Sequence, residues 1–303
     1  GKFLDTIAIL QDSLEYIDSH IQDNLTVDTL AARAGFSKWH FCRVFRWGTG
    51  LSVMGYVRSR RLAFAAYALS TERKILDISL AYGFETHSGF SKAFRRHYGC
   101  SPDVYRLHAR SECPSLPVLS RMKKYFTGGI VMEPKFVTLP AVQLAGYVLK
   151  TKSEGGQNLV DIPSFWAAYL ADGRMDRLHN ESFLKNHTEY GACFPGDPDT
   201  GVFDYVIGVE INPEVSVPDG YHVCEIPAAA YAVFSTPPSS EAANFSDTIQ
   251  RTWQYIFNEW FPGSGYEYAP GCADFELYDE RCMSEKEKIC DIYIPIVKRA
   301  EEI

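Results

Sequence analysis

The 303-residue sequence is long enough for two domains, and its composition excludes several classes of protein. A content of 46% hydrophobic and 14% aromatic residues supplies material for packed cores and argues against a disordered chain. We find no run of about 18 uncharged apolar residues and no secretory leader pattern, so we expect a cytoplasmic protein without a membrane partner.

The eight cysteines are dispersed along the sequence and form no Cys-x-x-Cys pair. In a chain of this length, the pattern favours free thiols in a reducing cytosol over a disulfide framework. The same lack of ligand spacing means that no structural zinc site, other metal or cofactor is predicted.

Charge divides the chain into two unlike parts. Residues 1–110 hold 15 Lys and Arg against 10 Asp and Glu, a net charge of +5, and residues 111–303 carry a net charge of −13. A basic segment suits the phosphates of double-stranded DNA, whereas an acidic segment repels them. The asymmetry therefore predicts two domains with different partners.

The first part of the chain has helical periodicity and contains an internal repeat. Apolar residues recur at helical spacing from Ile7 to Ile17. Two short amphipathic runs, residues 25–34 and 75–82, are each followed by Gly-Phe, at Gly35 and Gly83. A helix, a glycine turn with positive φ and a second helix together predict a helix-turn-helix motif, which occurs twice here.

The second helix of each motif has an apolar face and a polar face. Phe41 and Phe45 lie four residues apart, as do Phe90 and Phe94, so each pair shares the face that must join the core. Two such helices in one chain can enter successive major grooves about 34 Å apart. The residues left to meet DNA are Lys38, Trp39 and Arg43 in the first copy and Ser88, Ser91 and Lys92 in the second.

Residues 5–108 resemble the DNA-binding domain of the AraC/XylS family of transcription regulators. The resemblance rests on SKWHFCRVFRWGTG and on ILDISLAYGFETHSGFSKAFRRHYGCSPDVYR. It implies that Trp39 and Arg43 contact bases, that Cys42 stands where close relatives carry Gln, and that Lys92 replaces Arg. His87 and Ser88 also depart from those relatives, so the target sequence is expected to differ. The DNA-binding residues implied are Lys38, Trp39, Cys42, Arg43, His87, Ser88, Ser91, Lys92 and Arg96.

Residues 111–134 are rich in Pro and Gly and lack clear periodicity, which predicts a linker. It would separate a domain at 1–110 from one at 135–303. The second part alternates between strand and helix patterns and is predicted to be an α+β domain made of two similar passes of strand, helix, strand and strand. The first pass takes residues 136–150, 162–170, 189–194 and 203–211, and the second takes 222–234, 248–260, 275–278 and 289–296.

Glu276 is unusual because it lies between apolar residues in a predicted strand, on the same face as Tyr278. On the surface of an edge strand such a carboxylate would be unremarkable. In an aromatic cavity it would be costly to bury without a partner, and a bound cation is one natural partner.

Residues 132–303 are similar to the GyrI-like effector-binding domain, through WFPGSGYEY, FELYDE and KICDIYIPI. That family has an aromatic-lined pocket between the two passes, commonly with a buried Glu, and Glu276 matches this Glu. The remaining residues expected to line the cavity, each of which could instead be plain packing, are Tyr278, Tyr190, Tyr205 and Trp166.

Together the two resemblances imply a multidomain protein, with an all-α double helix-turn-helix domain followed by an α+β GyrI-like domain. They favour a transcription activator acting through RNA polymerase and sensing a small amphipathic, cationic effector. Two alternatives stay open for the second domain: a hydrolase in which the pocket Glu activates water, and a protein-interaction module without a ligand. His179, His187 and His222 show no catalytic or metal-ligand spacing, so an enzyme is not expected.

Overall fold

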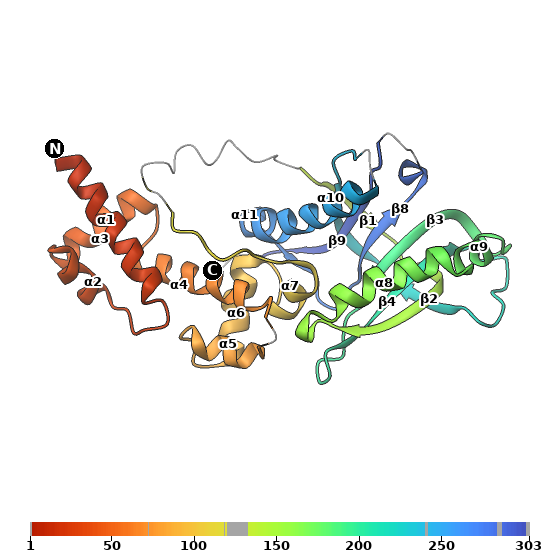
Figure 1. Ribbon diagram of the computed structural model, residues 1–303, viewed down its shortest axis with the longest axis horizontal. Coiled ribbons are helices and arrows are strands. Elements are labelled where there is room, and N and C mark those ends of the chain that lie inside the picture. The colour runs from red at the N-terminus through yellow and green to blue at the C-terminus, as the bar shows by residue number, and fades with distance from the viewer. Residues whose placement is uncertain are drawn as a thin grey trace. The chain divides into compact units, whose positions relative to one another are not determined.

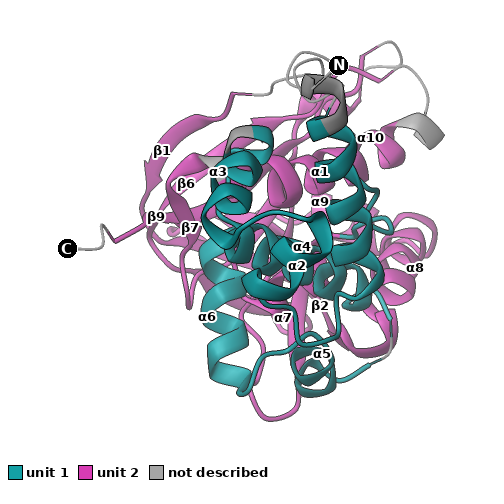
Figure 2. Cartoon of the chain, turned by 90° about the vertical axis from the view of Figure 1, so that its left-hand side faces the viewer, with its two compact units in different colours: residues 1–97, 110–131 teal, residues 98–109, 132–303 magenta. Residues whose placement is uncertain are grey.

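The computed structural model describes residues 2–71, 73–117, 119, 133–239, 242–283 and 287–300. Contacts divide the chain into two compact units (Figure 2). The first contains Gly1–His97 and Arg110–Val131, and the second contains Tyr98–Ala109 and Met132–Ile303. Most of the linker predicted at 111–134 lies outside the described residues.

The first unit is helical, as predicted. Leu10, Leu14 and Ile17 of its first helix are fully buried, so the spacing read from the sequence marks the core face. The next three helices begin after Thr26, Ser37 and Ser52, whose hydroxyls accept backbone N–H groups of the first turn. In order, the helices are α1 (Lys2–Ser19), α2 (Val27–Ala34), α3 (Lys38–Thr49), α4 (Val53–Ala68), α5 (Ile75–Ala81) and α6 (His87–Tyr98) (Figure 1).

Each predicted helix-turn-helix motif turns at its glycine. Gly35 follows α2 with φ of 73°, and Gly83 follows α5 with φ of 80°. Both lie in the left-handed region, which a residue with a Cβ enters only at a cost. The duplicated motif of the sequence is therefore a duplicated structure, α2–α3 and α5–α6.

A seventh helix, α7 (Pro102–His108), packs with the second unit. Tyr105 donates a hydrogen bond to Asn258, and the Nδ2 of Asn158 donates to the carbonyl of Leu107 at 3.0 Å. These bonds explain why the contacts assign residues 98–109 to the second unit, although the sequence analysis placed them in the first domain.

The second unit is an antiparallel sheet with helices. Among the described residues the strand order is β1-β6-β9-β8-β3-β4-β2-β5, with β7 paired to β9. The strands are β1 (Lys135–Leu139), β2 (Val142–Lys152), β3 (Leu184–Cys193), β4 (Val202–Ile211), β5 (His222–Ile226), β6 (Ala229–Ser235), β7 (Tyr266–Tyr268), β8 (Asp274–Tyr278) and β9 (Asp291–Lys298). The longer helical segments are α8 (Asn158–Ala171), α9 (Arg174–His179) and α10 (Ala242–Tyr255), which continues through a π-helical turn (Ile256–Trp260) into α11 (Phe261–Ser264).

The two predicted passes are present, and β3 of the first pairs with β8 of the second at the centre of the sheet. Each pass differs from the prediction at its start, where one long strand was expected and two are found. Pro140 separates β1 from β2, and Pro227 separates β5 from β6. Proline lacks the N–H that a ladder requires, so the strand breaks there, and each separated segment pairs elsewhere in the sheet.

No helix in the described part of the chain combines the length and the apolar character needed to cross a membrane.

We predict that Gly35→Ala lowers the free energy of unfolding of the first unit by about 1–2 kcal/mol, because alanine is strained in the left-handed region. A Cβ at this position would meet no atom within 4 Å, so a clash would not contribute. Gly35→Asn is the matched control, since Asn tolerates this conformation better. Urea denaturation followed by circular dichroism should rank glycine, asparagine and alanine in that order. Equal stability of the alanine and asparagine variants would contradict the turn assignment.

Candidate DNA-binding face and effector site

The phenylalanine pairs fix the orientation of α3 and α6. Phe41, Phe45, Phe90 and Phe94 are all 0% exposed. In each pair the ring centroids lie 5.6 Å apart, the spacing of favourable aromatic contacts. With these faces in the core, the opposite faces of both helices are exposed.

On α3 the predicted residues Trp39 and Arg43 lie on that exposed face. The Arg43 guanidinium lies 4.6 Å from the centre of the Trp39 ring, which is 67% exposed. This cation–π contact holds the hydrogen-bond donors of the Arg43 guanidinium beside the apolar Trp39 ring. Lys38 is also exposed, and its Nζ lies 3.6 Å from Asp28 Oδ1. Cys42 is half-buried.

On α6 the predicted residues are mostly exposed as well. His87 and Ser88 stand at the N-terminal end of the helix, and Lys92 and Arg96 follow one and two turns later. Ser91 is half-buried. Most of the predicted residues are therefore exposed on α3 and α6, and Cys42 and Ser91 are half-buried.

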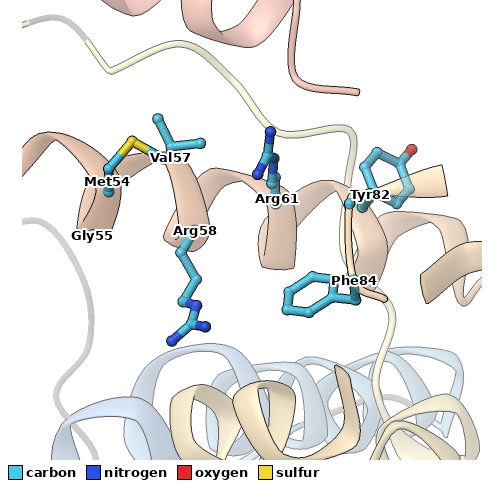
Figure 3. A pocket seen from close by; sticks show the side chains of 8 residues that line it. Met54, Gly55, Val57, Arg58, Arg61, Tyr82 and Phe84 are labelled. Atoms are coloured by element: carbon cyan, nitrogen blue, oxygen red, sulfur yellow. The ribbon is translucent and has the colours of Figure 1, made fainter. Parts of the chain in front are cut away.

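A separate hollow of about 360 Å³ lies in the first unit, between α4 and the turn after α5 (Figure 3). Met54, Val57 and Arg58 of α4 line it opposite Phe84. It contains none of the predicted site residues. Its second arginine, Arg61, is already bound to the carbonyls of Ile21 and Asp23 at 3.1 and 2.7 Å, so we do not assign it a ligand.

In the second unit, Glu276 lies on β8 between β3 and β9, so it is not on an edge strand. The Trp253 indole donates to its Oε1 at 2.7 Å, and the Tyr278 hydroxyl donates to its Oε2. Burial raises the pKa of the Glu276 carboxyl above its ordinary value, and the two hydrogen bonds act in the opposite direction. Two aromatic side chains, Trp253 and Tyr278, therefore donate hydrogen bonds to the Glu276 carboxylate.

Three of the other predicted pocket residues meet beside Glu276. Trp166 of α8 donates to the Tyr205 hydroxyl at 2.7 Å, and its ring centroid lies 5.1 Å from that of Tyr278. Burial raises the pKa of both tyrosine hydroxyls, which therefore remain neutral donors and acceptors.

Gly191 makes this closure sterically possible. It pairs with Glu276 across the β3–β8 ladder. A Cβ at this position would lie 2.4 Å from the Tyr205 hydroxyl oxygen and 3.2 Å from Trp166. A glycine is required because the aromatic rings occupy the space above it.

Tyr190 is not part of this cluster. It neighbours Gly191 on β3, and successive side chains of a strand point to opposite faces. Its ring packs 5.1 Å from that of Phe275, within the cluster on the other face of the sheet. The structure therefore separates Tyr190 from the other four residues predicted to line the cavity.

Trp253 and Gly191 were missed as site residues in the sequence analysis. For Trp253 the internal repeat carried a signal, since Trp166 and Trp253 occupy the helices of the two passes and each indole donates to a group of the cluster. For Gly191 no signal existed, because its importance depends on strand register.

Two histidines that the sequence analysis considered, His179 and His187, lie together in the second unit. His179 Nδ1 lies 2.9 Å from His187 Nδ1, and His179 Nε2 lies 3.4 Å from a Glu189 carboxylate oxygen. Tyr169 also donates to Glu189. His222 lies on β5, away from this group in the strand order.

Comparisons with known protein families match both parts of the chain. Residues 135–296 match the family described as integron-associated effector binding protein, and residues 30–108 match a helix-turn-helix domain. Transcriptional regulator Rob of Salmonella typhimurium is 35% identical over 144 residues, covering 47% of this chain and 48% of Rob. The chain thus spans about half the length of this relative.

Two further proteins are similar over one part of the chain each. Regulatory protein SoxS of Escherichia coli is 41% identical over 99 residues, covering 32% of this chain and 92% of SoxS. The structure of SAV2435 bound to tetraphenylphosphonium covers 55% of this chain and 94% of SAV2435, at 22% identity and a TM-score of 0.44.

We predict that Gly191→Ala destabilises the second unit by about 1–3 kcal/mol, because the new methyl group overpacks the aromatic cluster. The same substitution should cost less in a Tyr205→Phe background, where the nearest clashing atom is gone. Chemical denaturation of the four proteins of this cycle, followed by tryptophan fluorescence, measures the coupling. Identical costs in both backgrounds would show that the methyl group does not meet Tyr205.

Proposed function

Because the chain belongs to the AraC-type helix-turn-helix regulators with an integron-associated effector-binding domain, we propose that it binds double-stranded DNA and responds to a small molecule. It is a transcription regulator rather than an enzyme, and it works in the cytoplasm. The observation that carries the proposal is the pair of helices α3 and α6, each anchored by buried phenylalanines and exposing a polar face.

DNA binding is supported by the charge and the contacts of the first unit. The segment 1–110 has a net charge of +5, whereas the remainder has −13 and would be repelled by phosphates. On α3, the stacking of Arg43 on Trp39 presents a guanidinium that suits bidentate contact with a guanine edge. With two such helices, one chain reads two half-sites about 34 Å apart without dimerisation.

The role in transcription follows from the family. The relatives Rob and SoxS are named as regulators, and SoxS is matched over 92% of its length. We place this chain with regulators that activate promoters by recruiting RNA polymerase. The operator differs from those of the relatives, because α3 and α6 differ at base-contacting positions.

The effector site is the cluster of Glu276, Tyr278, Tyr205, Trp166 and Trp253. Its carboxylate and aromatic faces suit an amphipathic cation, which gains both ion pairing and cation–π contact. In the structure both carboxylate oxygens already accept hydrogen bonds. Each oxygen keeps a further lone-pair site, so the effector can meet the carboxylate while these two bonds hold it in place.

The bonded state of Glu276 also favours binding over catalysis. A general base that activates water must take a proton from that water. The hydrogen bonds from Trp253 and Tyr278 to the Glu276 oxygens stabilise the charged carboxylate and so make it a weaker base. The carboxylate is therefore assigned to recognition of charge.

We predict that Arg43→Ala weakens binding to the specific operator by about 1–3 kcal/mol and changes binding to random DNA much less, because a base contact is lost. Fluorescence anisotropy with both duplexes at one salt concentration gives the two affinities.

Arg251→Ala is the charge-matched control, since Arg251 is an exposed arginine of α10 paired with Asp247. It should leave both affinities unchanged. Equal losses on specific and random DNA for Arg43→Ala would assign this residue to the phosphate backbone instead.

We predict that Glu276→Gln weakens binding of a lipophilic phosphonium or quaternary ammonium cation by about tenfold or more, and that of a neutral analogue of similar size much less. The variant keeps the shape of the side chain and removes its charge. Isothermal titration of the full chain with both probes measures the difference.

Glu225→Gln serves as the control, because Glu225 is an exposed carboxylate on β5. Unchanged cation affinity in Glu276→Gln, or an equal loss in Glu225→Gln, would remove Glu276 from the effector site while leaving the DNA-binding proposal intact.

A further inference from the structure

Three side chains with metal-ligating atoms meet inside the second unit, on elements far apart in the sequence. His108 comes from α7, Cys193 from the end of β3 and Asp274 from the start of β8. One donor atom from each residue lies within 4.8 Å of the others. The His108 and Asp274 side chains are only 9% and 4% exposed, and Cys193 is 6% exposed. This trio is distinct from the bonds that hold Glu276.

His108 and Asp274 already form a close pair. The His108 Nε2 lies 2.7 Å from Asp274 Oδ2, and the Tyr268 hydroxyl donates to the same oxygen at 2.5 Å. The His108 ring also stacks on Trp253, with centroids 4.3 Å apart. These contacts fix the imidazole and the carboxylate so that both face the same small volume.

The Cys193 sulfur lies at the same volume. Within the same unit the Cys282 and Cys290 thiols each donate to a carbonyl, at 3.1 and 3.6 Å. The described part of the chain offers the Cys193 thiol no hydrogen-bond acceptor. The Cys193 side chain is buried, and its sulfur is grouped with the His108 and Asp274 donor atoms.

We propose that His108, Cys193 and Asp274 form a binding site for a divalent transition-metal ion, with Zn²⁺ as the best match. Imidazole nitrogen, thiolate sulfur and carboxylate oxygen are the donors that Zn²⁺ takes. A thiolate and a carboxylate together neutralise the charge of the ion, and this lowers the free-energy cost of burying it. On binding, the thiol proton leaves to solvent, and His108 gives up its Nε2 proton and binds as the neutral imidazole protonated at Nδ1, so that the ion lies between His108 and Asp274.

The geometry requires only a small adjustment. Around a tetrahedral ion, ligand distances of about 2.0–2.2 Å would place His108 Nε2 and Asp274 Oδ2 roughly 0.7 Å farther apart than in the structure. Three protein ligands leave one position open for water or for the neighbouring Tyr268 oxygen. The ion would fasten α7 to the two central strands of the sheet.

No ligand spacing in the sequence predicts this site, because its three residues meet only through the fold. Neither the DNA-binding face nor the effector cluster is needed for the inference. A test can therefore use metal binding alone, with the full chain and without a histidine tag.

We would strip the protein with a chelator and titrate it with Co²⁺, reading the thiolate-to-cobalt charge-transfer absorbance. The wild type should bind one equivalent with this band and should bind Zn²⁺ in competition. Cys193→Ala should lose the band and bind at least about tenfold more weakly, since even loss of an outer-shell partner costs roughly that much. The Cys193 thiol makes no hydrogen bond, so the variant should fold, and circular dichroism checks this.

Cys290→Ala is the matched control, as a buried cysteine outside the trio, and should keep the band. A wild-type protein without the band, or a band that survives Cys193→Ala, would overturn the proposal. Co²⁺ binding without the thiolate band, lost in His179→Ala, would also overturn the proposal, because it would assign the ion to the His179–His187 pair. A rise in melting temperature with Zn²⁺ in the wild type, absent in Cys193→Ala, would give independent support.

Discussion

The antiparallel pairing of β3 with β8 joins the two passes of the second unit, and the effector site that we propose depends on the register of this pairing. In this register Gly191 faces Glu276, and the missing side chain leaves room for Trp166 and Tyr205 to close beside the carboxylate. A slip by one residue would turn Glu276 to the other face, where Phe275 now packs. The register of this strand pair therefore sets which side chains meet at the centre of the sheet.

A comparable constraint organises the helical unit. The buried phenylalanine pairs hold one face of α3 and one face of α6 in the core. The side chains on the opposite faces are therefore the ones exposed to solvent. The side chains that we propose for DNA recognition, such as Arg43, are therefore presented by the packing of the opposite helix face. The charge division of the chain then confines DNA to this unit, because the remainder is acidic.

The features of the fold that follow from hydrophobic periodicity and from internal repeats could be predicted from the sequence. The Gly35 and Gly83 turns, the helical first part and the two passes of the second part all follow from local patterns, and the structure confirms them. The split of the opening strands at Pro140 could have been read from the sequence, because proline cannot donate to a ladder. The removal of Tyr190 from the cluster, the role of Gly191 and the packing of α7 with the sheet required strand register and tertiary contacts, which no local pattern contains.

The most direct test of the account is a selection of fragments from the source genome by the purified full chain, with and without a lipophilic cation. We expect an enriched motif of two half-sites roughly one helical turn apart, bound with an affinity that the cation changes. By reciprocity, the DNA should change the affinity for the cation by the same factor. Salt-sensitive binding without any sequence preference, under both conditions, would contradict the claim that this chain is an effector-controlled DNA-binding regulator.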